Sequence, residues 1–241
     1  MADILLEVCV DDAKGLAAAI RGGAGRIELC AALALGGLTP SPGLMQQAAA
    51  APVPVMAMIR PRAGGFVWST ADIAQMKADI AAVRAAGLAG VVLGASFPDG
   101  RLDAPVLAEL LQAAQGMDTT LHRCFDLTPD LPQALEAAVA LGFRRILTSG
   151  GARTAPQGVA MLAALMARAA DRITVMPGAG LTAETLPAIA RLPLREVHAS
   201  CSMARPETAS VAAFGFGPSE RRVTSEPLVR ALVAGLARLD E

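Results

Sequence analysis

The chain has 241 residues, of which 54% are apolar, 18% charged and 3% aromatic, and its formal net charge is −1. This composition indicates one soluble globular domain with a large core, and it excludes a disordered chain or a coiled coil. Nucleic acids and anionic membranes require clustered basic charge, so the near-neutral balance favours small-molecule partners.

Short β-branched or aliphatic runs alternate with Ala- and Leu-rich stretches along the sequence. Eight runs predict strands: Leu5–Val10, Arg26–Leu29, Val53–Ile59, Gly90–Leu93, Thr119–Arg123, Arg145–Thr148, Arg172–Met176 and Glu196–Ala199. Eight stretches predict helices: Asp12–Arg21, Pro42–Ala50, Thr70–Ala86, Asp103–Gln115, Leu131–Leu141, Ala155–Ala169, Thr182–Leu192 and Ser225–Arg238. Eight βα units in a chain close to about 250 residues predict an α/β fold, a single (β/α)8 TIM-type barrel over residues 1–241.

Two segments are longer than simple connectors. Residues 60–69 follow the third strand, and residues 200–224 form a long C-terminal loop before the last helix. Long loops in a compact domain are usually lids or contact arms, with mobile surface insertions as the alternative. The second segment would expose Met203, Phe214 and Phe216, so we expect a homodimer or higher oligomer, unless this loop folds over its own barrel as a lid.

The sequence also bears on the cellular location of the protein. The first residues lack a secretory pattern, and no apolar run approaches the roughly 20 residues of a membrane span. Four cysteines in a chain of this length then favour reduced thiols over a disulfide framework. We therefore expect a cytoplasmic protein that contacts neither membrane nor nucleic acid.

Charged residues in the strands point to the barrel interior. Barrel strands alternate between the helix layer and the interior, so the apolar positions face the helices and the charged ones face inward. This parity places Glu7, Glu28 and Arg60 on the inward face, with Arg60 directly after the third strand. His122 lies at the end of the fifth strand and Asp126 follows it, at the carboxyl rim where barrel enzymes build their sites.

These five ionisable groups are the candidate catalytic residues. Burying them is costly unless they bind or transform something, and opposed carboxylates beside Arg and His tune pKa values. Acid–base work by His122 with Glu7 or Glu28 is the simplest mechanism. The alternative is a polar plug in which Glu7, Glu28, Arg60, His122 and Asp126 only satisfy one another.

Glycine-rich turns after the sixth and seventh strands predict an anion-binding corner. Ser149 and Gly150 lie in one turn, and Gly178 and Gly180 lie in the other. Free backbone N–H groups at such turns attract phosphate or carboxylate, and this corner of a barrel is a common phosphate site. Together with the forked guanidinium of Arg60, they predict binding of a small anionic metabolite.

All four cysteines and both histidines fall at or just beyond the carboxyl end of a predicted strand. Cys9 and Cys30 are expected at equivalent heights on neighbouring strands, close enough for two thiolates to share one soft ion such as Cu(I) or Zn²⁺. Cys124 and Cys201 are better explained as small buried packing residues.

Ordered sequence blocks resemble the CutC family, whose members are usually named copper homeostasis proteins. The blocks are LEVCV from Leu6, GRIELC from Gly25, GGLTPS from Gly36, MIRPR from Met58, HRCFD from His122, LTSGG from Leu147, MPGAG from Met176 and EVHAS from Glu196. The resemblance implies a cytoplasmic, commonly dimeric barrel with a role in copper tolerance. It also implies that Cys9 and Cys30 are the Cu(I) ligands, whereas Cys124 stands where the family usually has alanine.

Two functions remain open at this point. The first is a Cu(I)-binding copper homeostasis protein. The second is an enzyme, a lyase, isomerase or hydrolase, acting on a small phosphorylated or carboxylated metabolite, with an indirect effect on copper. Schiff-base chemistry is excluded because the two lysines, Lys14 and Lys77, lie in predicted helices and not on an inner strand.

Overall fold

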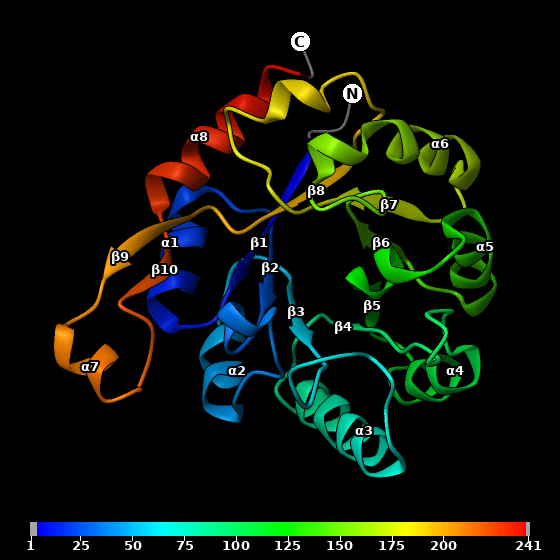
Figure 1. Ribbon diagram of the computed structural model, residues 1–241, viewed down its shortest axis with the longest axis horizontal. Helices are drawn as coiled ribbons and strands as arrows, with labels where there is room; N and C mark the ends of the chain where they lie inside the picture. The colour runs from blue at the N-terminus through cyan, green and yellow to red at the C-terminus, as the bar shows by residue number, and fades with distance from the viewer. Residues whose placement is uncertain (1–3, 240–241) are drawn as a thin grey trace.

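The computed structural model describes residues 4–239, and its centre is a ring of eight parallel strands (Figure 1). The strands are β1 Leu5–Val10, β2 Arg26–Leu29, β3 Val55–Met58, β4 Gly90–Leu93, β5 Asp118–Leu121, β6 Arg145–Thr148, β7 Thr174–Pro177 and β8 Glu196–Ala199. Each strand pairs with its sequence neighbour up to β7, and β1 also pairs with β8. Since β7 and β8 contact each other at the remaining seam, the barrel is nearly closed and the predicted (β/α)8 fold is confirmed.

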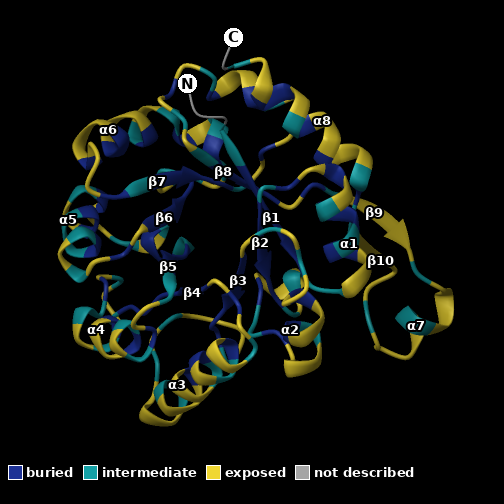
Figure 2. Cartoon of the chain, turned by 180° about the vertical axis from the view of Figure 1, so that it is seen from behind, coloured by how far each residue is buried: buried dark blue, intermediate teal, exposed yellow. Residues whose placement is uncertain are grey.

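Seven α-helices form the outer layer and pack their apolar faces on the strands (Figure 2). They are α1 Ala13–Gly22, α2 Pro42–Ala48, α3 Thr70–Ala85, α4 Ala104–Ala113, α5 Leu131–Leu141, α6 Val159–Ala169 and α8 Glu226–Ala237. The side chains of Asp12, Ser41 and Asp103 cap the first turns of α1, α2 and α4, as their sequence positions indicate. Over residues 4–239, none of the helices combines the length and apolarity that crossing a membrane requires.

The helix predicted over Thr182–Leu192 is wrong, because only a short 3₁₀ helix, η4 (Leu186–Ala188), forms there. Pro187 has no backbone N–H and would clash with the preceding turn, so a continuous α-helix is disfavoured at this position. Three further 3₁₀ helices lie in loops at the carboxyl ends of the strands: η1 Leu33–Leu35, η2 Arg123–Leu127 and η3 Ala155–Gly158.

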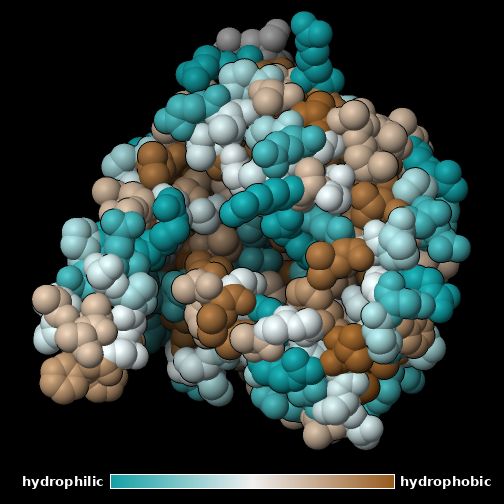
Figure 3. All heavy atoms as spheres, viewed as in Figure 1, coloured by the Kyte–Doolittle hydropathy of each residue, from teal (hydrophilic) through white to brown (hydrophobic). Residues whose placement is uncertain are grey.

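Residues 200–224, predicted as a loop, contain an ordered arm. It comprises β9 (Ser202–Pro206), the short helix α7 (Ala209–Ala213) and β10 (Glu220–Thr224), with β9 and β10 antiparallel. The arm stands away from the barrel and carries apolar side chains at its tip (Figures 1 and 3). Phe214 and Phe216 are 78% and 83% exposed, with stacked rings. The arm is thus not a lid over its own barrel, and the predicted homodimer remains a prediction.

Candidate functional site

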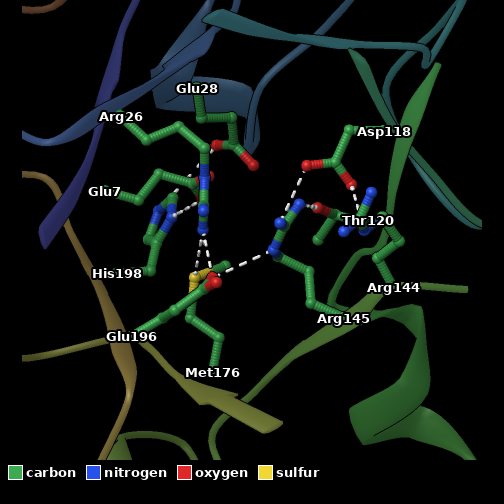
Figure 4. A network of polar contacts seen from close by, with 10 residues as sticks. All are labelled: Glu7, Arg26, Glu28, Asp118, Thr120, Arg144, Arg145, Met176, Glu196 and His198. Carbon is green, nitrogen blue, oxygen red and sulfur yellow. Dashed lines mark hydrogen bonds and ion pairs between the residues drawn. The ribbon is translucent and has the colours of Figure 1, made fainter. Parts of the chain in front are cut away.

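A charged network lies inside the barrel (Figure 4), and four of its members, Arg26, Asp118, Arg145 and Glu196, are the first residues of their strands. Arg145 donates to Glu196 at 2.9 Å and to Asp118 at 2.8 Å, while Arg26 donates to Glu196 and to Glu7. Both guanidinium groups are buried, and each has two carboxylate partners. Buried charges persist only when they are paired in this way, so this network is the polar plug considered above, built largely from other residues.

Glu7 joins this network to His198 on β8. The Glu7 carboxylate, which is fully buried, lies 2.9 Å from His198 Nδ1 and also accepts from Arg26. Burial alone would raise the pKa of Glu7, but the hydrogen bond from His198 and the charge of Arg26 lower it to about 2. Glu7 is therefore an ionised partner that fixes the orientation of the His198 ring.

Cys9, Glu28 and His198 form a buried cluster above Glu7, with ligand atoms all within 4.8 Å of one another. The strand register produces it, since Cys9 pairs with Glu28 and Glu7 pairs with His198. His198 Nε2 lies 3.8 Å from Glu28 Oε2. Burial lowers the pKa of His198, but the charges of Glu28 and Cys9 outweigh it, so its pKa is raised well above the ordinary value.

Cys30 does not lie level with Cys9, although the sequence predicted equivalent heights for the two residues. The register places Cys9 beside Glu28, and Cys30 follows two residues later. Its thiol is fully buried, donates to Glu28 Oε2 at 3.6 Å and packs in a small cluster with Met56 and Met58. Burial and the charge of Glu28 raise the pKa of the Cys30 thiol well above its usual range.

Arg60 lies directly after β3, with its guanidinium group held by backbone carbonyls. It donates from Nη1 to Leu35 O and Gly37 O, and from Nη2 to Gly64 O, at 2.8 to 3.0 Å. The Phe66 ring lies under the guanidinium group at 5.2 Å, and the buried Nε has no partner within the described residues. Arg60 thus anchors the loops at the rim while one donor remains unused.

His122, which follows β5, is buried against Phe66 with its ring 4.7 Å away. Its Nδ1 accepts the backbone N–H of Cys124 at 3.2 Å, and its Nε2 is buried without a partner in the part of the chain that the structure describes. Burial and the charge of Arg60 lower the pKa of His122 to about 3, so the ring is neutral and Nε2 carries the proton. A Cβ on Gly94 would approach this ring to 2.4 Å, so the site depends on glycine there.

Asp126 is saturated by the turn after β6. Its carboxylate accepts from the backbone N–H groups of Ser149 and Gly151 at 3.0 to 3.1 Å, from the hydroxyls of Thr148 and Ser149, and from Arg123 at 2.8 Å. Of the residues predicted to bind an external anion, Ser149 therefore donates to an internal carboxylate.

The remaining anion-binding predictions fall beside this turn. The N–H of Gly150 donates to Thr148 Oγ1 at 2.9 Å, and that of Gly178 donates to Thr148 O at 3.0 Å. Gly180, unlike Gly150, lines a cavity of about 530 Å³ between β8, the arm and α8. The glycine turns thus do not converge with Arg60 on one pocket, and anion binding by these residues remains a prediction.

A smaller cavity of about 220 Å³ occupies the barrel mouth, and the candidate groups meet there. Glu28, Arg60 and His122 line it together with Cys9 and His198. Glu28 Oε1, Arg60 Nε and His122 Nε2 are each buried, and among the residues that the structure describes they have no hydrogen-bond partner. Cys9, His198, Arg123 and Leu147 line both cavities, so the two spaces adjoin.

The fold and the site have clear relatives. The model of the CutC family matches residues 4–203. The chain belongs to the CutC family. It is 58% identical over 238 residues to a Sinorhizobium medicae relative named family protein CutC, covering 98% of this chain and 97% of the relative. A Caulobacter vibrioides relative of the same name is 51% identical over 240 residues, with 98% of both chains covered.

A solved structure shows the same architecture. The putative copper homeostasis protein CutC from Streptococcus agalactiae superposes with a TM-score of 0.78 at 32% identity, covering 82% of this chain and 98% of that one. Thiamine phosphate pyrophosphorylase from Pyrococcus furiosus, at 11% identity and a TM-score of 0.61, shares the fold alone. The family model ends at Met203, so most of the arm and all of α8 lie outside it.

Sequence reasoning missed the partners of the deep network and the central place of His198. Arg145 and Glu196 are the first residues of their strands, and the alternation rule was not extended to them. Asp118 is the first residue of β5, but the strand predicted from the sequence begins one residue later, at Thr119. His198 was noted only as a residue at the end of a strand. The alternation rule applied to the observed strand β8 places Glu196 and His198 on the same inner face, so this signal was available.

Proposed function

We propose that this protein acts in copper homeostasis by binding Cu(I) at the barrel mouth, with the Cys9 thiolate and His198 Nε2 as the principal ligands. The observation that carries this proposal is the buried cluster of Cys9, Glu28 and His198, whose ligand atoms lie within 4.8 Å of one another. Thiolate and imidazole are donors that suit soft copper, and Cu(I) accepts fewer ligands than the four usual for Zn²⁺.

The surroundings of His198 support a metal-binding role. Its Nδ1 lies 2.9 Å from the Glu7 carboxylate, which leaves Nε2 facing Cys9 and Glu28. Metal-bound histidines commonly donate their other N–H to a carboxylate, which fixes the ring and raises its basicity as a ligand. In this proposal Cys30 supplies a further thiol beside Glu28, near the thioether of Met58.

An anaerobic titration against a competing Cu(I) chelator tests the proposal. Cys9→Ser and His198→Gln should each weaken Cu(I) binding by at least about tenfold, because each removes a ligand. Cys124→Ser is the matched control, since Cys124 is equally buried but lies outside the cluster. Unchanged Cu(I) affinity in Cys9→Ser, or equal loss in Cys124→Ser, would contradict the proposal.

Replacing the Glu28 carboxylate distinguishes a Cu(I) site from a site for a harder ion such as Zn²⁺. Zn²⁺ readily accepts carboxylate ligands, whereas Cu(I) prefers sulfur and imidazole. We therefore expect Glu28→Gln to leave Cu(I) affinity within about threefold of wild type. A large loss of affinity in this variant, together with tighter binding of Zn²⁺ than of Cu(I), would replace the copper proposal with a divalent-metal site.

Enzymatic action on a small metabolite is the second proposed function. One observation favours it: around one cavity, three buried polar atoms on Glu28, Arg60 and His122 have no hydrogen-bond partner among residues 4–239. A protein that only carried copper would not require them. Among the candidate catalytic residues, Glu7 and Asp126 are fully paired, which leaves Glu28 and His122 as the groups free to exchange protons or hydrogen bonds with a substrate.

A further inference from the structure

Several buried polar side-chain atoms at the barrel mouth have no hydrogen-bond partner among the described residues. Six buried side-chain atoms lack a hydrogen-bond partner within residues 4–239, and three of them line the 220 Å³ cavity. A buried polar group that loses its hydrogen bonds to water and gains no partner destabilises the folded protein. Three such groups around one cavity are therefore expected to be satisfied by what fills the cavity, either water or a bound ligand.

Arg60 contributes a positive charge without an ionic partner. Its Nη atoms are occupied by carbonyls, and within the described residues it forms no salt bridge. The carbonyls and the Phe66 ring hold the guanidinium plane, so Nε–H keeps its direction. A ligand carboxylate would supply both the missing charge and an acceptor for Nε–H.

His122 contributes a second fixed donor. Its Nδ1 is an acceptor for the Cys124 N–H, and the ring is neutral, so Nε2–H is the only donor that it can offer. Glu28 Oε1 is the complementary acceptor on the same cavity. The mouth therefore offers two donors and one acceptor, and the side chains of Leu33, Met58 and Phe66 form apolar walls around them.

We propose that the barrel mouth binds a short hydroxy acid, whose carboxylate accepts from Arg60 Nε and His122 Nε2 and whose hydroxyl donates to Glu28 Oε1. This inference names the substrate class of the second proposed function and rests on it, but it is independent of Cu(I). The volume of about 220 Å³ suits a small molecule, and the adjoining cavity of about 530 Å³ accommodates a longer tail.

Ligand-detected NMR and calorimetry on the reduced, metal-free protein test the proposal. The probes are glycolate, lactate and malate, with acetate, propionate and succinate as their respective partners that lack the hydroxyl. At least one hydroxy acid should bind saturably, and about tenfold more tightly than its deoxy partner, because only the hydroxyl satisfies Glu28. This comparison uses the unmodified chain, so it does not depend on any variant folding.

Two variants assign the contacts. His122→Phe keeps an aromatic ring but removes Nε2–H, and it should weaken the hydroxy acid by about tenfold or more. Glu28→Gln should reduce the preference for the hydroxy acid over its deoxy partner. Asp79→Asn is the matched control, because Asp79 also has a buried oxygen without a partner but does not line this cavity.

The outcomes separate this inference from the copper proposal. Absence of saturable binding for every hydroxy acid, equal affinity for hydroxy and deoxy partners, or full affinity in His122→Phe would each overturn it. Binding of glycerol without binding of any carboxylate would also overturn it, since a neutral polyol leaves Arg60 uncompensated. None of these results alters the chelator titration, and a failed titration leaves the NMR result intact.

Discussion

The deep network and the barrel mouth contain the same residue types in opposite states. In the deep network, Arg26 and Arg145 each contact two carboxylates, and Glu7 contacts both Arg26 and His198. At the mouth, Glu28 and Arg60 are also buried but each retains an unpartnered atom. Pairing indicates that the first group is structural, and its absence is the reason we propose the second group as a binding surface.

Breaking the deep network should have the largest effect. Arg26→Met removes one of the two ionic partners of the buried Glu7 and one of the two of Glu196, which leaves Glu7 with His198 and Glu196 with Arg145. We expect a loss of about 3 to 5 kcal/mol in the free energy of unfolding. Chemical denaturation measures this loss, with Arg168→Met as the surface control, because its pair with Glu136 is exposed. A loss no larger than that of the control would remove the structural assignment.

The low pKa of His122 predicts an acid-sensitive contribution to stability. Its pKa is about 3 in the folded protein and near 6.5 in the unfolded chain, so the unfolded state binds the proton first as the pH falls. The contribution is present above pH 6.5 and is lost toward pH 3, by roughly 3 kcal/mol at pH 4.5. Unfolding of wild type and His122→Phe over this pH range measures it, and parallel pH profiles would contradict it.

Gly94 tests how tightly the fold holds the ring of His122. A Cβ at this position would lie 2.4 Å from both the His122 ring and the Cys124 sulfur. Gly94→Ala should therefore cost about 1 to 3 kcal/mol and displace the ring, with weaker binding at the mouth. Gly65→Ala is the control, because nothing lies near its Cβ position. Equal stability of the two variants would show that the ring moves freely.

The arm should have the smallest effect on stability. Phe214 and Phe216 are exposed at its tip, so replacing both with serine should change the free energy of unfolding by less than about 0.5 kcal/mol. If the arm mediates the predicted homodimer, the double variant should sediment as a monomer while wild type sediments as a dimer. A monomeric wild type at micromolar concentration would exclude the dimer.

Strand positions were readily predicted, because β-branched runs and alternation are local properties. The observed β1, β2, β4, β6 and β8 match the predicted ranges. The relative positions of residues on different strands were harder to predict from the sequence. The relative heights of Cys9 and Cys30 depend on the register between β1 and β2, which neither strand encodes alone.

The state of each polar group was least predictable from sequence. Asp126 was expected to be available, yet a turn more than twenty residues away saturates it. His122 and Glu28 were correctly placed at the mouth, but their unpartnered atoms emerge only from the assembled contacts. Sequence alternation therefore finds inward-facing groups, and tertiary contacts decide which of them are already satisfied.

One paired measurement tests the distinction most directly: the unfolding free energies of Glu7→Gln and Glu28→Gln in the metal-free protein. Both glutamates are buried on adjacent strands, and each substitution preserves side-chain size. Glu7→Gln should lose about 3 kcal/mol or more, because His198 loses the carboxylate that accepts from Nδ1 and Arg26 loses one of its two carboxylate partners. Glu28→Gln should remain within about 1 kcal/mol of wild type or exceed it. Equal losses in the two variants would contradict the assignment of a structural interior beneath a binding mouth.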